Sequence, residues 1–352
     1  MSYIFFYENY DIYKTEQLCA NLYKLMEMIF ISIKLKKTLV LPNFYMTPRN
    51  NELIDSLNEL IIDRIELIDI RNILNLDKLK EICNFISITD YMKLKNLETI
   101  IISKPNEDFP LIDEKYHTIY GVKKIKKHLI QDYSSLNILN VVNNYTKMND
   151  LMINDIIIHN YNRMGNPIWS RNELKDEYYT IRNTLKFNNE LIEKSNKIIE
   201  GIIKDKGIDF NNVLLVHWRR GDFKLNIADT EETKSYYQKY NKLNELENLI
   251  KNILLRCFEN KLTNILLITN ETNNNELLKL TSILTEFNIN TTIFDASDNN
   301  SYLKYLISDI CSIIIGSKCK YQLHGFGNYD RMSQYGRWII EENMSCVKYF
   351  LE

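Results

Sequence analysis

In "LLVHWRRGDFK", Leu214 to Lys224, a continuous apolar run ends abruptly in charged residues. A short uninterrupted run of this kind is typical of a strand buried on both faces of a parallel sheet. Arg219 and Arg220 follow the run directly. Ligands of open α/β sheets lie just beyond the carboxyl ends of the strands. The stretch therefore predicts a strand whose carboxyl end carries an anion site.

The residue types in this stretch suit a phosphate-bearing ligand. Arginine presents a planar, permanently charged fork that matches phosphate oxygens. Gly221 permits a tight turn and a close approach of the ligand, while His217 and Asp222 supply hydrogen bonds to a base, a ribose or the arginines. The alternative is a charged turn with a purely structural role. An adhesion role for the Arg-Gly-Asp tripeptide requires an extracellular loop, which the surrounding sequence does not support.

The segments on either side of this stretch alternate between strand and helix patterns. Strands are expected at "VLLVH", "NILLIT", "TTIFDA" and "SIIIGS", and helices at Tyr236 to Phe258, Glu276 to Phe287 and "SYLKYLISDIC". An amphipathic helix over Phe187 to Lys204 precedes them, and "DKGIDFNN" follows it as punctuation. Such regular alternation predicts a doubly wound α/β domain.

The first half of the chain opens in the same way. The strand "YIFFY", a helix over Thr15 to Leu35 and the run "KKTLVLPNF" make a βαβ unit, and "IELIDI" and "LETIIIS" are further strand candidates. At 352 residues the chain is long enough for two domains. We place the boundary after Lys204, which gives an N-terminal domain of residues 1–204 and a C-terminal domain of residues 205–352.

Composition excludes several classes of protein. The 44 Lys and Arg nearly balance the 46 Asp and Glu, so no global field favours nucleic acid or anionic membrane. The six cysteines are scattered without a CxxC pair, which argues for reduced core thiols and against zinc. The first residues resemble a strand and not a signal peptide, and no apolar window approaches the ~18 residues of a membrane span. We expect a cytoplasmic protein, and the Asn, Ile and Lys bias suggests a viral or protist genome.

The full pattern "HWRRGDF" resembles the protein O-fucosyltransferase-like glycosyltransferases and their fucosyltransferase relatives. Members carry a strand ending His-x-Arg-Arg or His-x-Arg-x-Gly, followed by Asp and an aromatic residue. Other segments are similar in the same order, namely "KKTLVLPNF", "IELIDIRNILNLDKLKEICNFISITDYMK", "LKFNNELIEKSNKII", "LLITNETNNNELLKL" and "SDICSIIIGSK". The resemblance thus covers most of the chain, although the arginine motif alone is specific.

The resemblance implies a GT-B-like α/β fold, with two Rossmann-like doubly wound domains facing a cleft. The donor, GDP-fucose or a related nucleotide sugar, would lie on the C-terminal domain, and a protein or glycan acceptor would lie in the cleft. Arg219 would hold the diphosphate and His217 would lie beside the nucleoside. Since the chain contains no Asp-x-Asp motif, a fixed guanidinium would stabilise the leaving diphosphate. The implied reaction is therefore metal-independent and inverting, with no cofactor.

Two turns depart from the family pattern. The first turn, usually rich in glycine, reads "YENYDIYKTEQ", where Glu8 or Asp11 is either the general base or part of a solvated charged turn. The turn after Gly316 reads "GSKCKYQLHGFGNYDR", where Ser317 is kept from the family's Ser/Thr-rich turn and Lys320 stands in place of a hydroxyl residue at the phosphates. The residue that reads the guanine edge has three candidates, which are Asp309, Asn270 and Glu271.

Two other interpretations stay open at this point. One is a catalytically degenerate protein of the same fold that binds a nucleotide sugar or a glycan without turnover. The other is an unrelated α/β nucleotide-binding protein with a chance arginine motif.

Overall fold

A computed structural model describes most of the chain as two compact α/β units, Met1–Asn189 and Glu190–Glu352. The described residues are 2–7, 18–41, 44–46, 66–94, 98–103, 124–129, 155–159, 172–219, 231–269, 271, 273–294, 303–325 and 334–351. The division falls at the start of helix α8 (Asn189–Lys206), so this helix goes with the second unit. The sequence analysis assigns the same helix to the first domain. Among the described helices, none is long and apolar enough to cross a membrane.

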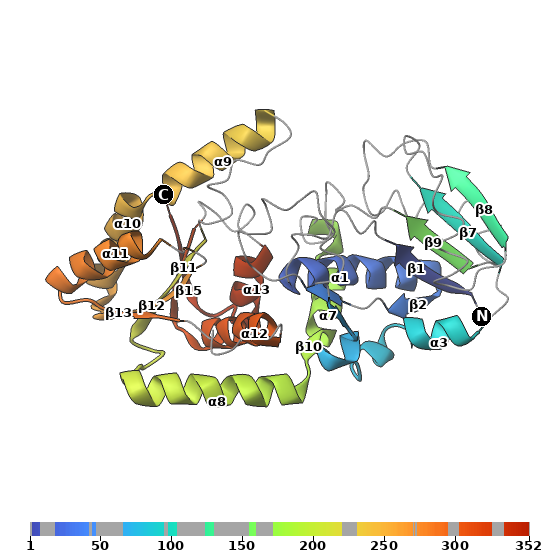
Figure 1. Cartoon of the computed structure of the whole chain (residues 1–352), viewed down its shortest axis with the longest axis horizontal. Helices are drawn as coiled ribbons and strands as arrows, with labels where there is room; N and C mark the ends of the chain where they lie inside the picture. The colour runs from blue at the N-terminus through green and yellow to red at the C-terminus, as the bar shows by residue number, and fades with distance from the viewer. Residues whose placement is uncertain are drawn as a thin grey trace. The chain divides into compact units, whose positions relative to one another are not determined.

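The first unit contains a six-stranded sheet in the order β6-β2-β1-β9-β7-β8 (Figure 1). Every strand pair in it is parallel. Its strands are β1 (Tyr3–Tyr7), β2 (Thr38–Leu41), β6 (Phe85–Ser87), β7 (Glu98–Ser103), β8 (Lys124–Leu129) and β9 (Asp155–His159). Helix α1 (Leu18–Leu35) connects β1 to β2, which confirms the predicted βαβ unit.

Smaller elements complete the first unit. The predicted strand "IELIDI" contributes only β4 (Glu66–Ile68), which pairs antiparallel with β3 (Phe44–Met46) outside the main sheet. A second antiparallel pair joins β5 (Leu74–Asn75) to β10 (Lys186–Phe187). The remaining elements are helices α3 (Ile88–Lys93) and α7 (Lys175–Thr184) and the short turns Ile70–Asn72, Leu79–Glu81 and Asn172–Leu174.

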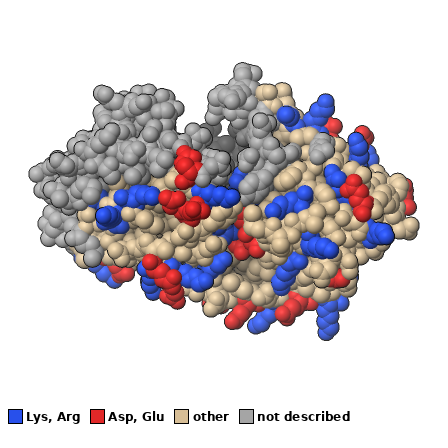
Figure 2. All heavy atoms as spheres, turned by 180° about the vertical axis from the view of Figure 1, so that it is seen from behind, with Lys and Arg blue, Asp and Glu red and all other residues tan. Residues whose placement is uncertain are grey.

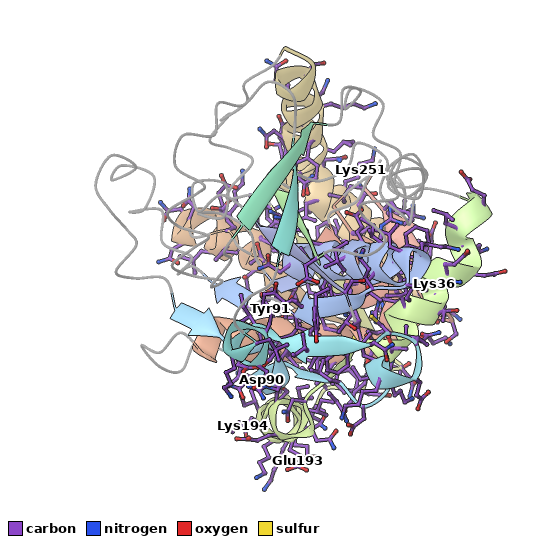
Figure 3. The ribbon with its side chains drawn as sticks, turned by 90° about the vertical axis from the view of Figure 1, so that its right-hand side faces the viewer. Lys36, Asp90, Tyr91, Glu193, Lys194 and Lys251 are labelled. Carbon is purple, nitrogen blue, oxygen red and sulfur yellow. The ribbon has the colours of Figure 1, made fainter. Side chains whose placement is uncertain are left out.

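A buried polar contact joins three elements of the first unit. Asp155 begins β9, and its carboxylate accepts hydrogen bonds from the Tyr3 N–H at 2.8 Å and the Tyr91 hydroxyl at 3.0 Å. On α3, Tyr91 is buried against the sheet, whereas its neighbour Asp90 is exposed (Figure 3). Burial raises the pKa of Asp155, and the same loss of solvent lowers the pKa of nearby Lys37 to about 8.

The second unit is built on a five-stranded parallel sheet in the order β13-β12-β11-β14-β15. Its strands are β11 (Val213–Trp218), β12 (Asn264–Thr269), β13 (Asn290–Ile293), β14 (Tyr321–His324) and β15 (Val347–Phe350). All six residues of β11 are buried, as the apolar run predicts for a central strand. The doubly wound α/β class is therefore confirmed for this half of the chain.

Helices cover both faces of this sheet (Figure 1). On one face of the sheet, alternate residues of β11 (Leu214, Val216 and Trp218) pack in one core cluster with helices α10 (Leu246–Asn260) and α11 (Asn274–Glu286). The opposite face, which includes Leu215, meets α12 (Leu303–Lys318) and α13 (Gln334–Glu342). Helix α9 (Glu231–Leu243) precedes α10.

Two predicted elements of this unit were wrong. The single helix expected over Tyr236 to Phe258 is interrupted at Asn244, between α9 and α10, where the Asn244 side chain bonds to distant main chain. The expected strand "SIIIGS" is the second half of helix α12. There α12 lies very close to α13. A Cβ on Gly316 would be only 2.1 Å from Ile339 Cγ2, so only glycine fits at this point of contact. A short apolar run does not distinguish a buried helix from a buried strand.

Candidate functional site

Three neighbouring strands of the second unit end at the same edge of the sheet, and Arg219 lies at that edge. Strand β11 is flanked by β12 and β14, with Trp218 paired to Thr269 and His217 paired to His324. Arg219, directly after Trp218, is half-buried. The chain runs outward from β11 through β12 to β13, and then returns to place β14 on the other side of β11. This reversal of strand order is the usual place for a ligand crevice.

On the α12 and α13 face, this edge gathers aromatic rings around His217. The His217 ring lies 5.7 Å from the His324 ring and 5.3 Å from the Tyr335 ring, centroid to centroid. The Tyr335 hydroxyl donates a long hydrogen bond of 3.5 Å to the main-chain oxygen of Asp309. Tyr335 therefore connects His217 with Asp309, two of the residues that the sequence singles out.

His324 is held as a neutral imidazole. The side chain of Gln322 donates from Nε2 to the Gly316 main-chain oxygen at 2.7 Å, so its Oε1 faces His324 Nε2 at 3.0 Å as an acceptor. Burial lowers the pKa of His324 well below its ordinary value, and the charges of His217 and Lys348 act in the same direction. Within the described residues its Nδ1 has no hydrogen-bond partner.

On the α10 face, the side chains at the break between α9 and α10 bind the strand ends. The Trp218 Nε1–H donates to the Asn244 main-chain oxygen at 3.1 Å, and the Tyr240 hydroxyl donates to the Arg219 main-chain oxygen at 2.6 Å. Asn244 Nδ2 donates to the Gly325 main-chain oxygen at 2.7 Å. Sequence reasoning missed Tyr240 and Asn244, because a polar residue within a helical pattern carries no sign of such distant partners.

The structure separates Gly316, Ser317 and Lys320 from Arg219. The Ser317 hydroxyl bonds to Ile314 within the last turn of α12, and Lys320 N–H donates to the Phe210 oxygen, ahead of β11. Lys320 also precedes Tyr321, which pairs with Leu214 near the start of β11. At ~3.3 Å per strand residue, Arg219 lies about 20 Å further along the sheet. Lys320, with Ser317 in the last turn of α12, therefore lies towards the amino edge, whereas Gly316 lies level with Leu215 in the middle of β11. The assignment of these three residues to the phosphates of the donor stays a prediction from sequence.

The other predicted site residues divide into two groups. Glu271 follows β12, is buried, and accepts a hydrogen bond from the Asn273 N–H at 2.9 Å, so it shares the carboxyl edge with Arg219. Asp309, in α12, is buried near His217, as described above. The remaining residues, which lie outside the described part of the chain, are Glu8, Asp11, Arg220, Gly221, Asp222 and Asn270.

Charge is mixed over the surface that Figure 2 displays, with Lys and Arg interspersed among Asp and Glu. This agrees with the formal net charge of −2, which leaves anion binding to local groups. Among the described residues, no three His, Cys, Asp or Glu side chains are grouped to hold a metal ion. All six cysteines are buried, and none of them forms a disulfide.

Comparison with known proteins places this arrangement in a class. The chain matches the family model for GDP-fucose protein O-fucosyltransferase over residues 23–335. The crystal structure of POFUT1 in complex with GDP-fucose superimposes with a TM-score of 0.62 at 11% identity, covering 99% of this chain and 98% of that chain. POFUT1 in complex with GDP gives a TM-score of 0.61, with the same identity and coverage. Among curated proteins, no sequence match was found.

The fold and the arginine at the end of its central strand thus define a GT-B-like, GDP-sugar-dependent glycosyltransferase. The match extends through both units and includes the whole strand-end motif. The chain belongs to the GDP-fucose protein O-fucosyltransferase family.

Proposed function

We propose that this protein transfers fucose from GDP-fucose to a hydroxyl group of a protein or glycan acceptor, with inversion and without a metal ion. The observation that carries the proposal is the position of Arg219, which follows the buried central strand β11 at the carboxyl edge of a parallel sheet. The family match and the fold shared with a GDP-fucose complex support the donor.

In the proposed reaction, the acceptor oxygen attacks C1 of fucose from the face opposite the diphosphate. A C1–O bond to the acceptor forms as the C1–O bond to the β-phosphate breaks, and GDP leaves with the bonding electrons. Arg219 stabilises the charge that develops on the diphosphate, because a fixed guanidinium at this position needs no reorganisation during the step. The acceptor proton passes to a base, for which Glu8 and Asp11 are the candidates from sequence.

We assign recognition of the nucleoside to the carboxyl edge of the sheet, on the side that faces helices α12 and α13. His217 is buried between the His324 and Tyr335 rings, which hold its imidazole plane at the strand end. Asp309 and Glu271, both buried carboxylates, are the acidic candidates for the guanine edge, since guanine presents N–H donors there.

The test is calorimetry on the purified protein without added metal, using GDP, GDP-fucose, GDP-mannose, UDP and UDP-GlcNAc. Wild type is compared with Arg219→Ala and Arg219→Lys. Binding of guanine nucleotides that Arg219→Ala weakens supports the proposal, and Arg219→Lys separates charge from bidentate geometry. Binding confined to a uridine nucleotide would overturn the donor. Binding of GDP-fucose without either transfer or hydrolysis would favour the non-catalytic protein.

A further inference from the structure

A group of four residues ties two strand ends together on the α10 side of the second unit. Trp218, Tyr240, Asn244 and Gly325 form this group, which we name the strand-end latch. We infer that Tyr240 and Asn244 are positioning residues, which set the main chain of Arg219 and of Gly325 at one fixed spacing for the donor. The inference rests on the proposed function, because it concerns the same strand-end site.

Tyr240 controls the direction in which the chain leaves β11. Its side chain is buried, and its hydroxyl donates a 2.6 Å hydrogen bond to the Arg219 main-chain oxygen. A carbonyl oxygen belongs to a rigid planar peptide group, so a bond to that oxygen orients the whole group. Tyr240 lies in the last turn of α9, the next described helix after Arg219. The bond therefore ties the end of helix α9 to the main chain directly after β11.

Asn244 binds the two strand ends at once. Its Nδ2 has two hydrogens, and these serve the Gly325 oxygen at 2.7 Å and the Tyr240 oxygen at 3.0 Å. Its main-chain oxygen accepts from the indole N–H of Trp218 at 3.1 Å. Asn244 is completely buried, so water does not compete for these contacts. Asn244 thus connects β11, through its main-chain oxygen, with the end of β14, through its side chain, at the edge where the donor is proposed to bind.

Gly325 is matched to Asn244 by shape. A Cβ at position 325 would lie 2.6 Å from Asn244 Oδ1 and 3.2 Å from the Tyr240 hydroxyl oxygen. In the described part of the chain, Asn244 Oδ1 accepts no conventional hydrogen bond. The Gly325 hydrogen in the place of a Cβ points towards this oxygen, which is the geometry of a weak Cα–H···O contact. Any larger residue would force β14 and Asn244 apart.

The test compares two tyrosine hydroxyls, one bonded to the main chain of Arg219 and one bonded to the end of helix α10. Tyr240→Phe removes the bond to Arg219, whereas the control Tyr349→Phe removes a hydroxyl bonded to Asn260 at the far end of α10. We expect Tyr240→Phe to raise the Kd for GDP about threefold to tenfold, the effect of one buried hydrogen bond. Tyr349→Phe should leave the Kd for GDP unchanged, even where urea unfolding shows a similar loss of stability.

A double-mutant comparison separates positioning from general stability. In the Arg219→Ala background, Tyr240→Phe should cause no further loss of GDP affinity or of kcat/KM for the donor, because Tyr240 acts through Arg219. Equal losses in the two backgrounds would overturn that role. Gly325→Ala supplies a second variant should Tyr240→Phe fail to fold. It should weaken GDP binding, and Asn244→Ala should reduce that effect by removing the opposing Oδ1.

Failure of the latch and failure of the proposed function give different results. If wild type binds GDP and Tyr240→Phe binds it equally well, the latch is overturned while the proposed function stands. If wild type binds none of the guanine nucleotides, the proposed function falls, and the latch loses the donor that it is inferred to position.

Discussion

His217 and His324 occupy paired positions on the neighbouring parallel strands β11 and β14, and their rings meet edge to face with centroids 5.7 Å apart. Burial disfavours protonation of His324, and the neighbouring His217 acts in the same direction. His324 has the Gln322 amide oxygen on its Nε2, and burial lowers its pKa well below the ordinary value. The pair therefore links the stability of the second unit to pH.

We predict that His324 makes the protein less stable as the pH falls below about 6.5. Below that pH the unfolded chain takes up a proton at His324 that the folded protein does not, so protonation favours unfolding. His324→Gln should flatten this part of the stability profile. The check is urea unfolding of both proteins from pH 7.5 to pH 5.5. Parallel profiles over that range would contradict the assignment.

Arg219 and Lys320 should differ sharply as functional residues. Arg219 follows β11 at the carboxyl edge, whereas Lys320 lies at the amino edge beside Phe210. We expect Arg219→Ala to lower the transfer rate by about 10²–10³, the usual cost of losing one preorganised charge donor. Lys320→Ala should retain the wild-type Kd for GDP and the wild-type rate. A large loss from Lys320→Ala would support the assignment made from sequence.

Two glycines in helices should respond to alanine in opposite directions. A Cβ on Gly316 would meet Ile339 Cγ2 at 2.1 Å, whereas a Cβ on Gly201 would have nothing within 4 Å. We predict that Gly316→Ala destabilises the protein by about 1–3 kcal/mol through overpacking. Gly201→Ala should stabilise it by about 0.5–1 kcal/mol, because alanine favours an exposed helix. Denaturant unfolding of both variants checks the pair, and a stabilising Gly316→Ala would refute the close approach of α12 to α13.

Lys37 should make the stability of the first unit rise with pH in the alkaline range. Burial lowers its pKa to about 8 from 10.5, although the Asp155 carboxylate opposes that shift. Between these two values the unfolded chain holds the proton more strongly than the folded protein, so stability increases as the pH rises. Lys37→Met lacks this contribution. The check is the unfolding free energy of both proteins at pH 7 and pH 9.5. The value for wild type minus the value for Lys37→Met should be larger at pH 9.5 than at pH 7.

Much of the fold could be predicted from sequence because strands and helices here have distinct patterns. The run Val213–Trp218 is uniformly apolar because β11 is the middle strand of a covered sheet. The βαβ unit at the start of the chain could be predicted as well, because a segment with helical periodicity, α1, separates two apolar runs. By contrast, β9 lies between β1 and β7, yet the polar sequence on either side of its five residues gives no clear pattern.

The candidate site was predictable only in part. Arg219 and His217 could be found because an apolar strand leads directly into them. The Ile-rich run before Ser317 and Lys320 was wrongly predicted as a strand, because such a run suits a strand as well as a buried helix. The predicted strand placed these two residues at the carboxyl edge, whereas in the structure they lie towards the amino edge. Tyr240 and Asn244 had no local signal at all, since their partners lie far away in the chain and are main-chain atoms.

Tyr240 and Asn244 of the strand-end latch bind the main-chain oxygens of Arg219 and Gly325, at the ends of β11 and β14. Every amino acid has the same carbonyl oxygen. Tyr240 and Asn244 therefore make these two bonds whatever side chains follow Arg219 and Gly325 in the chain. Scaffold and recognition surface are therefore separable. We therefore expect that the residues after Arg219 and Gly325 can be exchanged for those of enzymes with other nucleotide-sugar donors, with Tyr240, Asn244 and Gly325 left in place. Such grafting would turn this chain into a platform for new sugar-transfer specificities.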